Sequence, residues 1–187
     1  MKTALLVIDM QRTFLPTGAR TALPNILRLI SHFRSSASSA PIIFTQHGHP
    51  PSELHPTSSN QLVRKWGPSG AIAKGSPGAE LIDEIAQEVR SKEEVLDTKT
   101  AYDAFVKTDL GERLRREGVE RVVCCGVLTD ACCDATSKSA FNRGFETWLV
   151  GDACGTGDPE VHERTLEVWG VMYQYLKNTG EVIKELR

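Results

Sequence analysis

Three residues of this chain could together supply a nucleophile, a carboxylate and an ammonium group. Asp9 closes the apolar run 3–9, Lys99 follows the strand-like segment 93–98, and Cys132 follows the strand-like segment 120–127 at the start of a helical pattern. A thiol at a helix N-terminus feels the positive end of the helix dipole, and a nearby ammonium lowers its pKa further. A carboxylate could take the thiol proton and later return it to a leaving group. These residue types predict covalent catalysis by a cysteine.

Each of the three residues also has a structural interpretation. Asp9 could cap a turn, Lys99 could be solvated, and Cys132 could be a small buried hydrophobe. Cys133 follows Cys132 directly and would be turned about 100° from it around a helix, so the two side chains would not face one pocket equally. The residues alone leave open which cysteine reacts.

Length and composition set the class of the protein. With 187 residues, 40% of them hydrophobic, and a formal net charge of -2, residues 1–187 are expected to form one domain. The chain has no surplus of basic residues, so its composition does not indicate a nucleic-acid partner. The apolar run that ends at Asp9 is too short for a signal sequence or a membrane span, which predicts a cytoplasmic protein, with leaderless export as the alternative. Five cysteines, an odd number, do not suggest a disulfide scaffold or a cysteine zinc site.

The elements that must position these residues alternate along the chain. Strands are expected at 3–9, 41–46, 93–98, 120–127, 145–153 and 181–186, and helices from Pro24 and at 76–89, 109–118, 131–144 and 158–176. Residues 47–76 have no periodicity and are expected to form a lid or loop. This alternation predicts a Rossmann-like, three-layer α/β/α sandwich with a six-stranded, largely parallel sheet. In such sheets ligands bind outside the carboxyl ends of the strands.

Four motifs carry a resemblance to a known family. They are LLVIDMQ at 5–11, KTAYDAF at 99–105, GVLTDACCDAT at 126–136 and GFETWLVGDACGT at 144–156. In their order and separation they resemble the isochorismatase-like cysteine hydrolase superfamily, which includes nicotinamidases, N-carbamoylsarcosine amidases and isochorismatases. The resemblance covers nearly the whole chain and implies the α/β fold expected above.

The same resemblance assigns roles to residues. It implies that Asp9, Lys99 and Cys132 form the catalytic triad, with Cys132 as the nucleophile and Cys133 as a packing residue. It also implies a cis peptide bond between Val127 and Leu128. The backbone N–H groups of Leu128 and Cys132 would then form an oxyanion hole.

The function expected from this resemblance is hydrolysis of a small amide or ureido C–N bond through a thioester. One alternative is an isochorismatase, in which Asp9 acts as general acid on a vinyl ether and no cysteine is needed. Another is a binding or scaffolding protein with a vestigial site. The candidate substrate-binding residues are Gln11, Phe14, Trp66, Tyr102 and Phe105. The expected partners are a small-molecule substrate and further copies of the chain in a dimer or tetramer, with no membrane.

Three histidines follow the second expected strand. Nicotinamidases of the superfamily bind a metal through Asp-x-His-x5-His, and here His49 and His55 match the two histidines while His47 replaces the aspartate. Imidazole suits transition ions, so a divalent zinc or iron ion is a candidate cofactor, although the triad requires none. The alternative is that these histidines contact the substrate or fasten the loop. His162 is interpreted as a surface or packing residue.

Overall fold

The computed structural model describes residues 1–35, 40–173 and 175–186. Its sheet has six strands in the order β3-β2-β1-β4-β5-β6, and every neighbouring pair is parallel. The strands are β1 (Thr3–Ile8), β2 (Ile42–His47), β3 (Val95–Lys99), β4 (Arg121–Val127), β5 (Glu146–Gly155) and β6 (Leu176–Lys177). β1 lies in the interior of the sheet, and all its residues are buried, which explains its continuous apolar run. The predicted fold class is confirmed.

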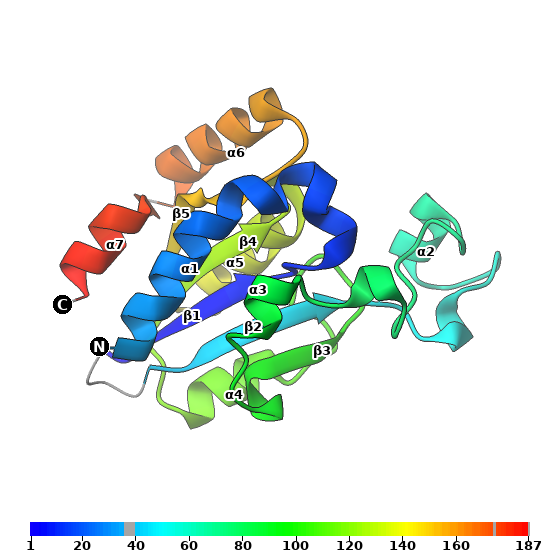
Figure 1. Ribbon diagram of the computed structural model, residues 1–187, viewed down its shortest axis with the longest axis horizontal. Helices are drawn as coiled ribbons and strands as arrows, with labels where there is room; N and C mark the ends of the chain where they lie inside the picture. Colours follow the sequence, from blue (N-terminus) through cyan, green and yellow to red (C-terminus); the bar gives the residue numbers. More distant parts are fainter. Residues whose placement is uncertain (36–39, 174, 187) are drawn as a thin grey trace.

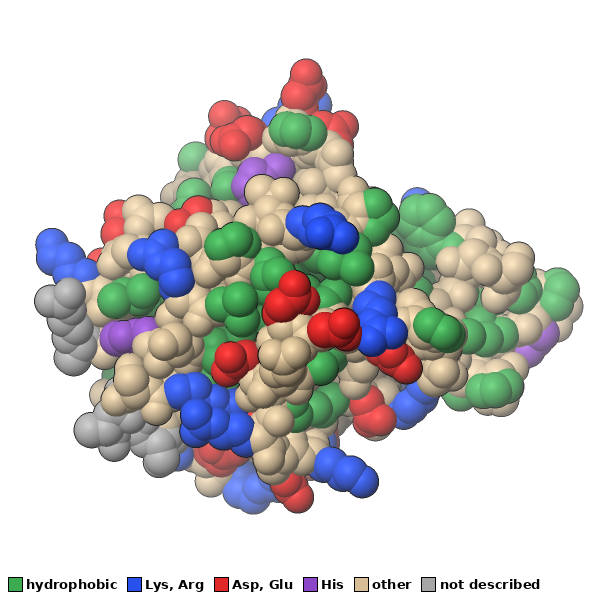
Figure 2. Space-filling model, in the orientation of Figure 1, with side chains coloured by type: hydrophobic (Ala, Val, Ile, Leu, Met, Phe, Trp, Pro, Cys, Tyr) green, Lys and Arg blue, Asp and Glu red, His purple; other side chains and the backbone are tan. Residues whose placement is uncertain are grey.

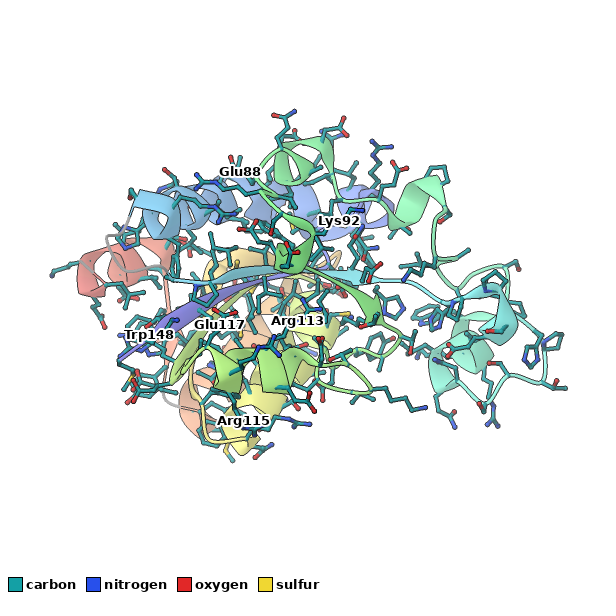
Figure 3. All side chains as sticks on the ribbon, turned by 90° about the horizontal axis from the view of Figure 1, so that it is seen from below. Glu88, Lys92, Arg113, Arg115, Glu117 and Trp148 are labelled. Carbon is teal, nitrogen blue, oxygen red and sulfur yellow. The ribbon has the colours of Figure 1, made fainter. Side chains whose placement is uncertain are left out.

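Helices cover both faces of this sheet (Figures 1 and 3). One hydrophobic cluster lies between the sheet and α1 (Arg20–Ser35), α3 (Asp83–Ala86) and α7 (Thr179–Glu185). The cluster on the other face includes side chains of α4 (Leu110–Arg116), α5 (Asp134–Asn142) and α6 (Pro159–Met172). The molecule is therefore built in three layers, with a core on each side of the sheet.

The structure corrects three predicted elements. Residues 181–186 are not a strand: they lie largely within α7, which begins with a capping box between Asn178 and Glu181, and the sixth strand is Leu176–Lys177. The first helix begins at Arg20, so Pro24 lies inside it. The helix predicted at 76–89 is reduced to a 3-10 turn and α3, because the backbone of residues 80–82 instead hydrogen bonds to that of residues 10–12.

The lid expected at residues 47–76 contains a 3-10 turn at Pro51–Glu53 and the short helix α2 (Gln61–Trp66). Its two ends are joined by a bridge between His49 and Ala73. Figures 1 and 2 show this segment projecting from one end of the sheet, with hydrophobic side chains on its surface. It therefore overhangs the end of the sheet where β1 and β3 finish.

The surface carries little that identifies a partner. None of the helices in the described part of the chain is long and apolar enough to cross a membrane. Val168, Val171 and Met172 are exposed on α6. The expected assembly into a dimer or tetramer stays a prediction.

Candidate active site

The parallel sheet brings the three predicted catalytic residues together. Asp9 follows β1, Lys99 is the last residue of β3, and Cys132 lies in the π-helical turn Thr129–Cys133 that follows β4. The Lys99 Nζ atom lies 2.5 Å from Asp9 Oδ2 and 3.3 Å from Cys132 Sγ. All three side chains are buried. The triad geometry predicted from the sequence is therefore present.

Asp9 is held in place by its own backbone and by β2. Its φ of 47° lies in the left-handed region, which turns the chain sharply at the end of β1. The Asp9 N–H donates to Thr45 Oγ1 at 3.1 Å, and the Thr45 hydroxyl donates to Asp9 Oδ1 at 2.5 Å. One carboxylate oxygen thus faces Thr45 and the other faces Lys99.

The charges of Asp9 and Lys99 stabilise each other. Burial opposes ionisation of Asp9, but the attraction of Lys99 and the hydrogen bonds from Lys99 and Thr45 outweigh it, so the pKa of Asp9 lies below its usual value. Burial likewise opposes protonation of Lys99, yet Asp9 and Cys132 raise the pKa of Lys99 above its usual value. At neutral pH the site contains a carboxylate and an ammonium.

The thiol is in the opposite state from the one expected. The sequence suggested that the helix and Lys99 would lower the pKa of Cys132. Burial instead raises the pKa of the Cys132 thiol to about 12, because the lowering effect of Lys99 is also opposed by the charge of Asp9 and a hydrogen bond with it. The resting nucleophile is therefore a neutral thiol beside a carboxylate that can accept its proton.

The two adjacent cysteines face different surroundings. Cys132 lines a cavity of about 270 Å³, whereas Cys133 is fully buried in the same core cluster as Cys154. The turn that carries both follows Gly126, whose φ is +125° and where a Cβ would lie 2.1 Å from Ile8 O. Only glycine lets β4 approach the end of β1 so closely. Cys132 is the cysteine that a ligand can reach.

The cavity lies between the lid and the ends of the strands. Its lining residues are Thr13, Phe14, Thr17, His47, His49, Leu62, Trp66, Gly70, Ala71, Ile72, Tyr102, Leu128, Ala131 and Cys132. Phe14, Trp66 and Tyr102 were predicted as substrate-binding residues, and the Trp66 indole donates to the Tyr102 hydroxyl at 3.2 Å. None of these lining residues is Asp, Glu, Lys or Arg. The cavity suits a small uncharged molecule.

Two of the predicted substrate-binding residues do not line this cavity. The Gln11 amide donates to the carbonyls of His47 at 2.8 Å and Ala79 at 2.7 Å, and its oxygen accepts from the His47 N–H at 2.9 Å. Gln11 therefore joins β2 to the 3-10 turn Pro77–Ala79 that follows the lid. Phe105 is buried and stacks on Phe145 with 6.2 Å between ring centroids. Its role is in the core.

The turn before Cys132 is shaped by its first peptide bond and by the Leu128 carbonyl. The peptide bond between Val127 and Leu128 is cis. The Leu128 carbonyl accepts hydrogen bonds from the N–H groups of Ala131 at 3.1 Å and Cys133 at 3.0 Å, which closes the turn. Leu128 also lines the cavity beside Cys132. The oxyanion role of the Leu128 and Cys132 N–H groups stays a prediction.

The three histidines are only partly brought together. His47 Nε2 lies 3.1 Å from His49 Nε2, and the other ring nitrogen of His49 lies 2.9 Å from Glu53 Oε2. His55 is exposed, and its ring nitrogen Nδ1 lies 3.1 Å from the Thr57 hydroxyl. Among residues 1–35, 40–173 and 175–186, no three His, Cys, Asp or Glu side chains are grouped to hold a metal. As placed, the residues do not fit the three-histidine site, and metal binding stays a prediction.

His47 instead belongs to the triad's surroundings. Its Nδ1 atom lies 3.5 Å from Lys99 Nζ, and the side chain lines the cavity. Burial, together with the charge of Lys99, lowers the pKa of His47 to about 4. The imidazole beside the ammonium is therefore neutral at neutral pH.

Some site residues were missed from the sequence. Thr45 binds Asp9, and Thr13, Thr17 and Ile72 line the cavity. Thr45 carried a signal in the sequence, because it is a polar residue that directly follows the apolar residues 42–44 of β2. The other three carry none, since their positions depend on how the segments after β1 and β2 fold over the sheet.

Comparisons with known proteins agree with this geometry. A model of the isochorismatase domain matches residues 3–175. The chain is 36% identical over 183 residues to nicotinamidase 3 of Arabidopsis thaliana, covering 98% of this chain and 88% of the relative. The structure of N-carbamoylsarcosine amidase from Thermoplasma acidophilum is similar at a TM-score of 0.75, with 28% identity, 96% of this chain and 97% of the other covered.

A third match concerns the fold alone. A cysteine hydrolase from Pseudomonas syringae pv. phaseolicola 1448A has a TM-score of 0.83 and 22% identity, and the alignment covers 99% of this chain and 92% of that structure. The domain match and the relatives extend over nearly the whole chain. The chain therefore belongs to the isochorismatase family of hydrolases.

Proposed function

We propose that this protein is a cysteine hydrolase that cleaves the C–N bond of a small, uncharged amide. The observation that carries the proposal is the Cys132 thiol, which lines the cavity and lies 3.3 Å from the Lys99 ammonium, itself 2.5 Å from the Asp9 carboxylate. A nucleophile, a proton acceptor and a fixed positive charge meet where a substrate can enter. Relatives named nicotinamidase and N-carbamoylsarcosine amidase support amide chemistry.

The charge states set the first half of the reaction. Asp9 accepts the thiol proton as Cys132 Sγ attacks the carbonyl carbon, which forms the C–S bond and places the electron pair on the carbonyl oxygen. The Leu128 and Cys132 N–H groups bind that oxyanion. Collapse of the tetrahedral intermediate breaks the C–N bond. Asp9 gives its proton to the departing nitrogen, and a thioester remains on Cys132.

The second half uses the same groups. A water molecule gives a proton to Asp9 while its oxygen attacks the thioester carbon. The C–S bond breaks, the acid product leaves, and the proton returns from Asp9 to the sulfur. Lys99 stays protonated throughout, because its pKa is raised by Asp9 and Cys132. Its charge favours the ionised carboxylate at rest and the thiolate during attack.

The cavity favours an uncharged amide over ureido acids, which the sequence left equally open, and over the isochorismatase and scaffold alternatives. Isochorismate and ureido acids carry carboxylates, and among the described residues no Lys or Arg side chain lines the cavity to pair with them. A scaffold protein would have no need of a buried ion pair beside a thiol, because isolating charges from water costs several kcal/mol. Phe14, Trp66 and Tyr102 instead offer flat apolar surfaces to a planar ligand.

The test is a matched pair of substitutions at adjacent cysteines. Cys132→Ala should lower kcat for amide hydrolysis by about 1000-fold or more, because the covalent route is removed. Cys133→Ala, which changes a core side chain outside the cavity, should retain kcat within about threefold. Ammonia release would be measured with nicotinamide, an uncharged amide, and with N-carbamoylsarcosine, a ureido acid that should be the poorer substrate, and pyruvate release would be measured with isochorismate. Turnover of isochorismate alone, or equal kcat in the two variants, would contradict the proposal.

A further inference from the structure

A histidine outside the cavity contacts the turn that carries the nucleophile. Thr129 is the first residue of the turn Thr129–Cys133, and its side chain is fully buried. Its Oγ1 atom lies 2.9 Å from Nδ1 of His162, in the first half of α6. No other side-chain hydrogen bond to Thr129 is found among the described residues. One side-chain hydrogen bond thus joins the buried turn to α6.

His162 has a firm support. α6 begins at Pro159, and its N-cap Asp158 accepts hydrogen bonds from the N–H groups of Glu160 at 2.9 Å and Val161 at 3.4 Å. The His162 N–H donates to the Asp158 carbonyl at 3.0 Å. β5 leads directly to this cap and pairs with β4 at its end. The imidazole is therefore anchored to the same strand ends as the triad.

The turn itself needs such a support. Two of its N–H groups donate to the Leu128 carbonyl, and the Asp134 N–H donates to the carbonyls of Thr129 and Ala131. These bonds fix the shape of the turn and its continuation into α5 but do not join it to α6. The Thr129 hydroxyl points to α6, while Cys132 faces the cavity. A small shift of the turn would move the sulfur away from Asp9 and Lys99, and misplacement by about 1 Å can cost on the order of 100-fold in rate.

We propose that His162 is a positioning residue, which acts through Thr129 to hold the turn so that the Cys132 thiol stays aligned with Asp9 and Lys99. The kinetic part of this inference rests on the proposed function. The structural part does not, because restraint of the turn is measurable without a substrate. The contact uses Nδ1 and a hydroxyl, each of which can donate or accept.

The choice of variants follows from which ring nitrogen is used. The amide of asparagine takes the place of Nδ1, whereas that of glutamine takes the place of Nε2. His162→Asn should therefore keep kcat within about twofold of wild type. His162→Leu and His162→Gln should each lower kcat by about tenfold and leave KM within about twofold, since one aligned hydrogen bond is lost and the cavity lining is unchanged.

Thr129 provides the other side of the test. Thr129→Ser keeps the hydroxyl and should behave as wild type, whereas Thr129→Val should lower kcat as much as His162→Leu does. The double variant should show no further loss, because both substitutions remove one contact. Losses that multiply in the double variant, or equal kcat for His162→Asn and His162→Gln, would overturn the inference.

Hydrogen exchange tests the same contact when no turnover is found. In His162→Leu, the amides of residues 128–133 should exchange about tenfold faster than in wild type, and in His162→Asn at the wild-type rate. Amides of β1 serve as the internal control for global stability and should be unchanged. Wild-type exchange of residues 128–133 in His162→Leu would disprove the positioning role whatever the substrate. Faster exchange without turnover in the wild type would support it and contradict only the proposed function.

Discussion

The two ends of the same sheet use similar residues for different purposes. At the carboxyl end, Asp9, Lys99 and Cys132 are buried beside a cavity. Toward the other end, Arg121 pairs with Glu146 at 2.7 Å and its guanidinium lies 4.2 Å from the Trp148 ring centroid. Figure 3 shows Trp148 at the end of the molecule away from α2. Each end thus contains a cation, a carboxylate and a third partner.

The two ends differ in the solvent exposure of their ion pairs and in whether a cavity lies beside the pair. The Arg121 and Glu146 side chains are 16% and 23% exposed, so solvent stabilises their charges and the pair adds only modestly to stability. The Asp9–Lys99 pair is fully buried, so each charge depends on the other. When a buried ion pair borders a cavity, its charges act strongly on a reacting group in that cavity. That is what separates a catalytic ion pair from a structural one in this fold.

The largest expected difference between the two ends concerns their carboxylates, Asp9 and Glu146. Asp9→Asn removes the only proton acceptor in the proposed mechanism and should lower kcat by about 1000-fold or more. Glu146→Gln removes a carboxylate of the opposite end and should leave kcat within about twofold. Steady-state amide hydrolysis measures both. If Asp9→Asn retained even a tenth of wild-type kcat, the proton transfer assigned to Asp9 would be wrong.

The lysines give the next largest difference. Lys99→Met leaves Asp9 buried without its cation and should lower the free energy of unfolding by about 3–5 kcal/mol at neutral pH. Lys177→Met, which removes a partly exposed pair with Glu185 and a contact with Trp148, should cost about 1 kcal/mol. Urea denaturation measures both values.

The pH dependence of that difference has a definite sign. In wild type the pKa of Asp9 is lowered, so the pair stabilises the fold above the unfolded pKa of aspartate and is lost as the pH falls. Without Lys99, burial raises the Asp9 pKa instead. The deficit of Lys99→Met should therefore narrow as the pH falls toward about 4. A deficit that widens in acid would show that Asp9 is not ionised by its pairing with Lys99.

The sequence predicted the layers, and the position of Asp9, Lys99 and Cys132 after strands, for a physical reason, whereas their assignment as a triad came from the family resemblance. Buried strands are continuous apolar runs, so the residues that end them are legible, and parallel pairing places those ends together. Local patterns failed where tertiary hydrogen bonds intervene. Residues 80–82 looked helical but pair with residues 10–12. Residues 181–186 were expected to be a strand but lie largely within α7, although Asn178 and Glu181, which form its capping box, could be read from the sequence.

The cavity and the thiol's ionisation were beyond sequence reasoning. Ile72 and Leu62 reach the cavity because the lid folds over the strand ends, which no local pattern specifies. The effect of Lys99 on Cys132 was predicted with the right sign, but the cost of burying a thiolate exceeds it, and burial depth is a property of the assembled fold. The effect of neighbouring charges on the pKa of a thiol can be inferred from a motif, whereas the effect of its burial cannot.

The rate of alkylation of Cys132 measures how far burial at this end of the sheet raises the pKa of its thiol. Because the thiolate is the reactive form and the pKa of Cys132 is about 12, its reaction rate with iodoacetamide should rise about tenfold per pH unit from pH 7 to 10, without a plateau. Mass spectrometry of the peptide containing Cys132 would follow the rate. The same cysteine in urea-unfolded protein should level off above about pH 8.5. A plateau near neutral pH in the folded protein would restore the thiolate that the sequence suggested.

The tryptophans provide the smallest expected effect on the site. Trp66 lines the cavity and is 57% exposed. Trp66→Ala should raise KM by about threefold to tenfold, because an aromatic contact of about 1 kcal/mol with the substrate is lost. The same substitution should change the free energy of unfolding by less than about 0.5 kcal/mol. Trp148→Ala should leave KM unchanged and cost about 3–5 kcal/mol of stability, since Trp148 is buried at the opposite end. Kinetics and urea denaturation of both variants separate the outcomes. An unchanged KM in Trp66→Ala would mean that the lid's aromatic face does not contact the substrate, and that recognition depends on Phe14 and Tyr102.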